Sequence, residues 1–210
     1  MSQISPFEEN LPKNQANYSP LTPLSFLTRT AEVFPERTAV IHGETKRSWR
    51  ETLKRCIRLA SALKKKGVVQ GTTVSVMAPN VPELLEAHFG VLMTGGVLNA
   101  LNIRLEAETL AYILEHGESQ VLITDREFSP VIKKVLQQLE DPPLIIDIDD
   151  PMAEGGELLG EMDYEAFLKT GDENFEWNLP EDEWQAVSLN YTSGTTGKPK
   201  GVVYHSRGAH

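Results

Sequence analysis

Tyr191–Gly201 reads YTSGTTGKPKG and is the most informative feature of the 210-residue chain. It combines four Ser or Thr hydroxyls, three glycines and two lysines. Glycines permit positive φ and close backbone approach, so successive N–H groups can form a nest that binds an anion. Hydroxyl and ammonium groups add hydrogen bonds and charge for phosphate oxygens. The composition therefore predicts a loop that holds a polyphosphate.

The flanking residues indicate that this loop is held in place. A strand-like run, AVSLNY, leads into it at Ala186–Tyr191, and a second run, VVYH, leads out at Val202–His205. A flexible Gly/Ser/Thr linker with two solvated lysines is the alternative interpretation of such a composition. Two bordering strands favour the positioned loop over the linker.

The stretch is not a Walker A loop. That motif needs G-x-x-x-x-G-K-[ST] followed by a helix. Here Pro199 follows Gly197 and Lys198, and Thr192 stands where the first glycine of the motif would be. The Ser or Thr whose hydroxyl binds magnesium in that motif is therefore missing, and the residues after the loop have the pattern of a strand where the motif has a helix. An ordinary P-loop ATPase or kinase is therefore disfavoured.

The stretch does resemble the phosphate loop of the adenylate-forming enzymes, which include acyl- and aryl-CoA ligases, luciferases and peptide-synthetase adenylation domains. Their loop reads [ST]SGTTG-x-PKG, and Thr192–Gly201 matches every specified position. Val76–Glu83 (VMAPNVPE), Gly95–Arg104 (GGVLNALNIR) and Ile113–Asp125 (ILEHGESQVLITD) also look like this family. The segments 99–105 (NALNIRL) and Val203–Gly208 (VYHSRG) are most similar to fatty- and medium-chain acyl-CoA synthetases.

This resemblance implies a ligase that works in two steps. A carboxylate, here a fatty or medium-chain acid, attacks the α-phosphate of Mg·ATP to give an acyl-adenylate and pyrophosphate, and coenzyme A then displaces AMP. The implied catalytic residue is Lys200, which would neutralise the departing pyrophosphate. Lys198 stands at a variable position of the family motif and is expected to give support at most. The implied ATP-binding residues are Thr192, Ser193, Gly194, Thr195, Thr196, Gly197 and Lys200.

The resemblance also implies that much of the machinery lies outside these residues. The family's groups for adenine, ribose, Mg²⁺ and the acyl chain, and its carboxy-terminal lid, would follow His210. We therefore expect an amino-terminal subdomain truncated after the phosphate loop and inactive alone. A truncated, non-catalytic nucleotide-binding or interaction module is the alternative. Ser206 replaces a histidine that is frequent in the family's acyl-CoA synthetases, and we expect it to N-cap a following helix.

Outside the loop, the hydrophobic pattern predicts an α/β fold. Strands alternate with helices, which implies a parallel sheet that is covered on both faces. We expect strands at 38–42, 74–78, 97–101, 121–124 and 144–148, and helices at 24–34, 48–66, 83–94, 106–116 and 128–139. We divide the chain into an extended, mobile arm (1–20), an α/β subdomain (21–150), an acidic connection (151–183) and a strand–phosphate loop–strand unit (184–210) that starts a further subdomain.

The formal net charge of −10 is concentrated in one stretch. Residues 140–184 hold 16 of the 30 acidic residues and one base, Lys169. We interpret this stretch as a solvated connection with little buried area, and nothing in the charge pattern suggests binding to nucleic acid. Asp147, Asp149 and Asp150 raise the alternative of a metal site, but they follow a strand without partner ligands at a defined spacing. We therefore assign no metal ligands.

The single cysteine, Cys56, excludes an internal disulfide, and its helical surroundings indicate a buried structural thiol. His42, His88 and His116 are scattered, so we expect ordinary core or surface roles for them. No apolar run approaches the roughly 18 residues of a membrane span. The N-terminus has no apolar secretory core, so the expected location is cytoplasmic. The oligomeric state is not readable from the sequence.

Overall fold

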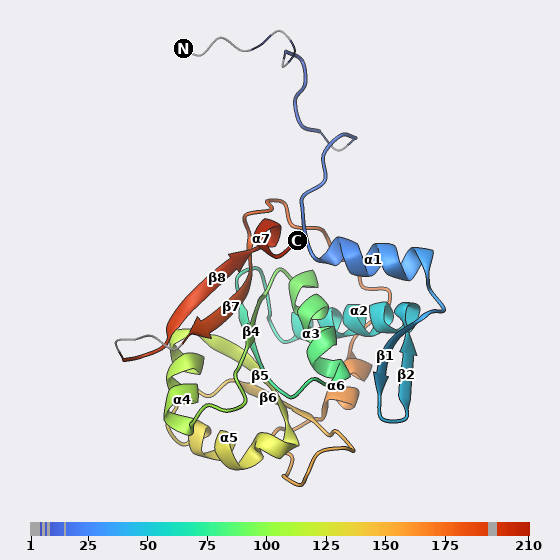
Figure 1. Cartoon of the computed structure of the whole chain (residues 1–210). Helices are drawn as coiled ribbons and strands as arrows, with labels where there is room; N and C mark the ends of the chain where they lie inside the picture. Colours follow the sequence, from blue (N-terminus) through green and yellow to red (C-terminus); the bar gives the residue numbers. More distant parts are fainter. Residues whose placement is uncertain (1–4, 6, 8, 15, 193–196) are drawn as a thin grey trace.

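The structure is a computed structural model that describes residues 5, 7, 9–14, 16–192 and 197–210. It contains two sheets, a small β1–β2 hairpin and a six-stranded sheet in the order β6-β5-β3-β4-β7-β8 (Figure 1). The elements are α1 (Leu24–Val33), β1 (Thr38–His42), β2 (Thr45–Ser48), α2 (Trp49–Lys65), β3 (Thr73–Met77), α3 (Pro82–Met93), β4 (Val97–Ala100), α4 (Ala107–His116), β5 (Ser119–Asp125), the 3₁₀ helix η1 (Arg126–Phe128), α5 (Ser129–Leu136), β6 (Leu144–Ile148), α6 (Tyr164–Thr170), β7 (Ala186–Thr192), β8 (Lys200–His205) and α7 (Ser206–Ala209).

The large sheet is covered by helices on both faces, which confirms the predicted α/β class. Strands β6, β5, β3, β4 and β7 are parallel to one another, and β8 runs antiparallel to β7. Successive side chains of β3 point to opposite faces. Val74 and Val76 pack with α2, α3 and α6, whereas Met77 packs with α4 and α5. Because both faces are buried, the whole of β3 is apolar or small.

Local sequence signals determine where α2 begins and ends. Ser48 and Glu51 form a capping box, in which the Glu51 backbone N–H donates to Ser48 Oγ and the Glu51 carboxylate accepts from the Ser48 N–H. The backbone hydrogen bond from Ser48 lowers the pKa of Glu51. At the other end, Gly67 has a φ of 89°, a left-handed conformation that glycine adopts without strain. The predicted start and stop of this helix are both confirmed.

Helices α2 and α3 approach closely because α3 carries a glycine at the contact. A Cβ atom on Gly90 would lie 2.7 Å from Leu59 Cδ2 and 3.0 Å from the Cys56 carbonyl oxygen. Cys56 is fully buried in this contact, which confirms the expected structural thiol. Burial raises its thiol pKa well above the usual range, so it is unsuited to act as a nucleophile at neutral pH.

The acidic stretch contributes to the core, so the expectation of little buried area is wrong. Asp163 caps α6 by accepting a hydrogen bond from the Ala166 N–H at 2.7 Å. Tyr164, Phe167 and Leu168 then follow at helical spacing and pack into the main core with exposed fractions of 2%, 1% and 3%. Between them, Glu165 is half-exposed and pairs with Arg55, and the apolar face of α6 docks the stretch onto the body.

A buried carboxylate ties α2, α3, β2 and α6 together. Glu86 is 0% exposed and accepts hydrogen bonds from Arg55 Nε at 2.6 Å, Arg47 Nη1 at 2.9 Å and the Tyr164 hydroxyl at 3.0 Å. Burial alone would lower the pKa of Arg55, but its hydrogen bonds to Glu165 and Glu86 raise it above the ordinary value. The Arg55 guanidinium is therefore charged at neutral pH and is paired with both carboxylates.

Most expected elements are present within one to three residues of their predicted ends. The short strand β2 and the helix α6 were not predicted. The described residues between 5 and 20 form turns and irregular segments that lead away from the body (Figure 1), and the mobility expected of this arm stays a prediction. The boundaries at 20, 150 and 183 also stay predictions, although the same sheet runs from β3 through β8.

Candidate functional site

The predicted phosphate loop connects two paired strands. β7 pairs in parallel with β4 through Leu98 and Ser188, and it pairs antiparallel with β8 up to Thr192 and Lys200. The loop therefore leaves the sheet at the edge where the parallel strands have their carboxyl ends. Ligands of open α/β sheets bind outside this edge. The two expected strands are present as β7 and β8, and the edge at which they end is typical of a binding site.

The structure describes the two ends of the loop. Thr192 and Lys200 are exposed and face each other as the last pair of the β7–β8 ladder, so both are accessible to a ligand. Gly197 has a φ of 122°, which favours glycine. The remaining predicted phosphate-binding residues lie outside the described part of the chain, namely Ser193, Gly194, Thr195 and Thr196. The assignment of ATP contacts, and of Lys200 as catalytic, therefore stays a prediction.

Helix α4 contacts both ends of the loop, which the sequence did not suggest. The Tyr191 hydroxyl lies 2.7 Å from His116 Nδ1, and the two rings meet edge to face at 5.7 Å between centroids. On the other side, Lys198 Nζ lies 4.7 Å from the centre of the Tyr112 ring, a cation–π distance. Tyr112 and His116 are four residues apart and so share one face of α4. This four-residue spacing is visible in the sequence. It points to the contact with the loop only once β7 is known to lie near α4.

Two glycines make room for the Tyr191 ring. A Cβ on Gly117 would lie 3.3 Å from the Tyr191 hydroxyl oxygen and 2.9 Å from the Ile113 carbonyl oxygen. A Cβ on Gly201 would lie 3.0 Å from Leu189 Cδ1 and 3.5 Å from the Tyr191 ring. Burial, followed by the nearby Tyr112, raises the pKa of Tyr191. The phenol is therefore neutral and remains a hydrogen-bonding group at physiological pH.

The segment after β8 differs from the expected capping arrangement. The N-cap of α7 is His205, whose Nδ1 accepts a hydrogen bond from the Gly208 N–H at 2.9 Å. The expectation that Ser206 caps this helix is wrong. Ser206 is fully buried, and its backbone N–H donates to the Gln185 carbonyl at 2.9 Å, which draws the residue inward as the first residue of the helix.

An ion pair joins this C-terminal segment to the acidic stretch and to the start of the body. Glu183 accepts a hydrogen bond from the Leu21 N–H at 3.0 Å and pairs with Arg207 at 2.5 Å. The hydrogen bond from Leu21, then that from Arg207, lowers the pKa of Glu183. Three segments that are distant in the sequence therefore meet at one carboxylate.

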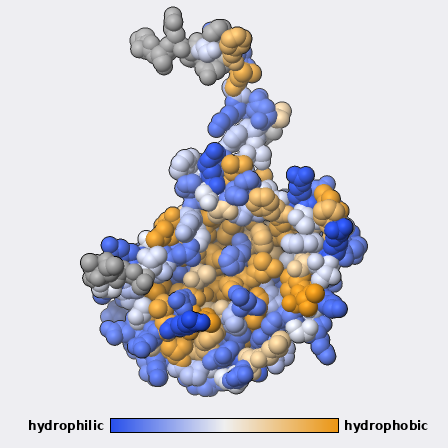
Figure 2. Space-filling view, viewed as in Figure 1, coloured by the Kyte–Doolittle hydropathy of each residue, from blue (hydrophilic) through white to orange (hydrophobic). Residues whose placement is uncertain are grey.

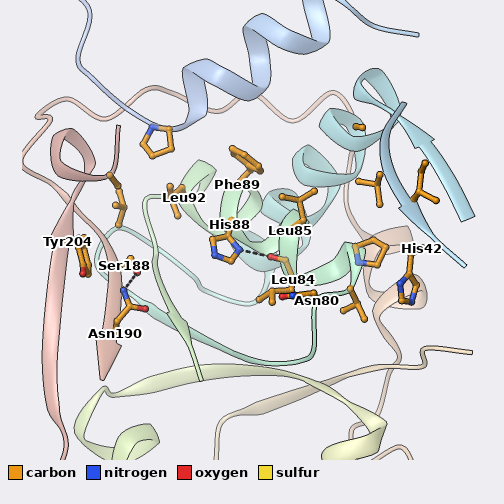
Figure 3. A pocket seen from close by; sticks show the side chains of 18 of the residues that line it. His42, Asn80, Leu84, Leu85, His88, Phe89, Leu92, Ser188, Asn190 and Tyr204 are labelled. Atoms are coloured by element: carbon orange, nitrogen blue, oxygen red, sulfur yellow. Dashed lines mark hydrogen bonds between the residues drawn. The ribbon is translucent and has the colours of Figure 1, made fainter. Parts of the chain in front are cut away.

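A large apolar groove lies beside the β7–β8 hairpin. In Figure 2 apolar residues gather over α3, between α1, the β1–β2 hairpin and the β7–β8 hairpin. The groove has a volume of about 800 Å³ and a lining that is mostly hydrocarbon. Two of its polar side chains already have partners, since His88 Nδ1 donates to the Leu84 carbonyl at 2.7 Å and Asn190 Nδ2 donates to Ser188 Oγ at 3.0 Å (Figure 3). The groove is therefore an apolar contact surface.

Asp147 in β6 and the two aspartates that follow the strand each have a separate partner. Asp147 accepts hydrogen bonds from the backbone of Leu159 and Gly160, Asp149 pairs with Arg126 at 2.8 Å, and Asp150 pairs with His42 at 3.0 Å. In the part of the chain that the structure describes, no three His, Cys, Asp or Glu side chains are arranged to hold a metal ion.

None of the helices within the described ranges has both the length and the hydropathy needed to cross a bilayer.

Comparison with known proteins places the chain in one family and identifies similar proteins from plants. Residues 27–210 match the family described as AMP-binding enzyme. The acetate/butyrate–CoA ligase AAE7, peroxisomal, of Arabidopsis thaliana is 48% identical over 214 residues, which cover 96% of this chain and 38% of that protein. The trans-cinnamate:CoA ligase, peroxisomal, of Petunia hybrida is 41% identical, with 96% of this chain and 38% of that protein covered. The chain thus spans less than two fifths of the length of these relatives.

Solved structures share the fold. The anthranilate CoA ligase AuaEII in complex with anthranoyl-AMP superposes with a TM-score of 0.80 at 24% identity, covering 93% of this chain and 37% of that one. A putative long-chain-fatty-acid CoA ligase from Rhodopseudomonas palustris gives a TM-score of 0.73 at 24% identity, with 89% and 45% covered. The described sheet and its helices are therefore an arrangement found within larger CoA ligases.

Proposed function

The chain belongs to the family of AMP-binding enzymes, and from this premise we propose that it forms the amino-terminal part of an AMP-forming acid–CoA ligase. The observation that carries the proposal is the β7–β8 hairpin, which presents the Thr192–Gly201 motif at the carboxyl edge of the sheet. Two relatives that match the chain over 96% of its length are named as an acetate/butyrate–CoA ligase and an acetate–CoA ligase, which supports the same reaction class.

The proposed role of the chain is to bind and align the triphosphate of ATP. The backbone and hydroxyl groups of the loop would surround the β- and γ-phosphates, and the Lys200 ammonium would stabilise charge on the departing pyrophosphate. The protein needs no covalent step here, because the substrate carboxylate is itself the nucleophile and alignment lowers the barrier. Mg²⁺, bound with the ATP phosphates, would add charge neutralisation, and coenzyme A would enter in the second half-reaction.

We propose a short aliphatic acid as the substrate, ahead of the fatty or medium-chain acid expected from the sequence. The names of three relatives specify acetate or butyrate, acetate, and 2-methylpropanoate, at 48%, 47% and 40% identity. A fourth relative is named for cinnamate at 41% identity, which makes an aromatic acid the second choice.

The cellular location has two candidates. The sequence led us to expect the cytoplasm, whereas several relatives carry "peroxisomal" in their names. We propose the peroxisome as the first location to examine, by imaging the tagged full-length gene product. A diffuse cytoplasmic signal in cells with labelled peroxisomes would favour the original expectation.

The test of the proposed function is acid-dependent exchange between ATP and labelled pyrophosphate, measured on the full-length gene product. We expect exchange with acetate or butyrate to exceed exchange with cinnamate, decanoate and palmitate at equal concentration. Exchange that is absent with every acid, although ATP still binds, would refute the ligase and support the non-catalytic nucleotide-binding module. Exchange that is fastest with decanoate or palmitate would refute only the choice of a short acid.

A further inference from the structure

We propose that Tyr112 and His116 of α4 are positioning residues that hold the two ends of the phosphate loop and thereby set the affinity for ATP. This inference rests on the proposed function, because it gives the loop the task of binding triphosphate. Four described residues carry it: Tyr112 and His116 on α4, and Tyr191 and Lys198 at the ends of the loop.

The first contact holds the entry of the loop. Tyr191 is the residue before Thr192, and its hydroxyl lies at hydrogen-bond distance, 2.7 Å, from His116 Nδ1. The ring itself is half-buried and packs against the α4–α5 side of the core. Gly117 and Gly201 leave the space that the ring occupies. The hydrogen bond therefore acts on a side chain that packing has already oriented, so little conformational entropy opposes it.

The second contact holds the exit of the loop. Lys198 Nζ lies over the Tyr112 ring, one helical turn before His116. Tyr112 and His116 also pack against each other, with 5.2 Å between their ring centres. The two contacts therefore share one rigid face of α4. Tyr191 and Lys198, held on one helix, have less conformational freedom to lose when a ligand binds beside them, which raises affinity.

The arrangement gives Lys198 a role that its variable position in the motif did not suggest. Lys198 would act by holding the loop through Tyr112. Lys200, in contrast, pairs with Thr192 at the last position of the β7–β8 ladder. The two lysines thus differ in kind: the aromatic ring is the partner of one, and phosphate would be the partner of the other.

The test is a set of variants of the full-length gene product, with KM for ATP and kcat measured separately by pyrophosphate exchange. We expect His116→Ala and Tyr191→Phe each to raise KM for ATP about fivefold, which corresponds to about 1 kcal/mol for one hydrogen bond at 1.4 kcal/mol per tenfold. The double variant should raise KM no more than either single variant, because both remove the same contact. The value of kcat should stay within about twofold, as expected when binding in the ground and transition states is weakened equally.

The contact between Lys198 and the Tyr112 ring is tested with two substitutions of Tyr112, one that removes the aromatic ring and one that keeps it. Tyr112→Leu removes the aromatic face and should raise KM for ATP about two- to fivefold, the range for an exposed cation–π contact. Tyr112→Phe keeps the face and should retain the wild-type KM. Glu115→Ala is the matched control, because Glu115 is an exposed residue on the same helix.

The outcomes separate the inference from the proposed function. If the wild-type protein catalyses exchange and KM is unchanged in His116→Ala, Tyr191→Phe and Tyr112→Leu, the positioning role is refuted and the ligase stands. A fall in kcat at constant KM would also refute it, since that result reports a smaller fraction of folded enzyme. If the wild-type protein shows no exchange with any acid, the proposed function fails, and the inference fails with it.

Discussion

Replacing Glu86 by glutamine tests whether one buried carboxylate organises the helical layer formed by α2, α3 and α6. Glu86→Gln keeps the size of the side chain and removes its charge. The carboxylate is 0% exposed, and its oxygens accept from Arg55 at 2.6 Å, Arg47 at 2.9 Å and Tyr164 at 3.0 Å. A neutral amide leaves two partly buried guanidinium groups with weaker partners. Glu165 remains near both arginines, which limits the loss.

The expected magnitude follows from the burial of the cluster. Breaking a buried ion pair by removing one partner costs about 3–5 kcal/mol, because the remaining charge is left uncompensated. The presence of Glu165 places Glu86→Gln at the lower end, about 3 kcal/mol. For a chain of this length, 1 kcal/mol shifts the melting temperature by about 2–4 °C, so we expect a decrease of about 6–12 °C.

The assay is thermal and urea unfolding of the 210-residue chain, followed by far-ultraviolet circular dichroism. Glu161→Gln, an exposed substitution in the acidic stretch, is the matched control and should change stability by no more than about 0.5 kcal/mol. Tyr164→Phe removes one hydrogen bond to the same carboxylate and should cost about 1 kcal/mol. Equal melting temperatures for Glu86→Gln and Glu161→Gln would show that the buried cluster contributes nothing to stability, and the reasoning would fail.

Three further predictions concern other sites. In the full-length gene product, Lys200→Ala should slow pyrophosphate exchange by roughly 10- to 150-fold, the equivalent of about 1.5–3 kcal/mol for a charge-assisted contact, and Lys198→Ala should cost much less; equal losses would contradict the assignment of the two lysines. The hydrogen bond from Arg55 lowers the pKa of Glu165, so its contribution to stability is present above the unfolded pKa of about 4.3 and is lost as pH falls through the lower folded pKa. Glu165→Gln should therefore lose less stability than the wild-type chain between pH 5 and pH 3 in urea titrations, and parallel losses would disprove this. Gly90→Ala should lower the free energy of unfolding by about 1–3 kcal/mol, because a Cβ there would lie 2.7 Å from Leu59 Cδ2; a gain in stability would show that α3 can shift away from α2 at little cost.

The sequence predicted the parts of the fold that local signals control. The capping box at Ser48 and the glycine at Gly67 set the ends of α2, and Pro82 occupies the first position of α3, a position that suits proline. The alternation of strands and helices predicted the parallel sheet, because apolar runs separated by amphipathic helices have few other packing solutions. The two strands around the phosphate loop were also predicted, and they form the hairpin that presents it.

The missed features depend on contacts between distant segments. Tyr164, Phe167 and Leu168 have helical spacing, but they are embedded in an acidic stretch whose charge dominated its interpretation. Their burial depends on the surface that α2 and β6 provide. In the candidate site, the contact between His116 and Tyr191 spans 75 positions of sequence. No local pattern reports such a pairing, because it arises only when β7 joins the sheet beside β4.

The buried Cys56 gives this protein a natural reporter of local opening. It is the single cysteine of the chain and lies in a cluster with Leu24 and Leu27 of α1 and Met93 of α3. Because the thiol is fully buried, a thiol-specific reagent reaches it only after these helices separate. The labelling rate of the unmodified protein under native conditions therefore measures how often α1 and α3 part from α2. Nucleotide or partner binding that rigidifies this layer would be recorded as slower labelling, without any introduced probe.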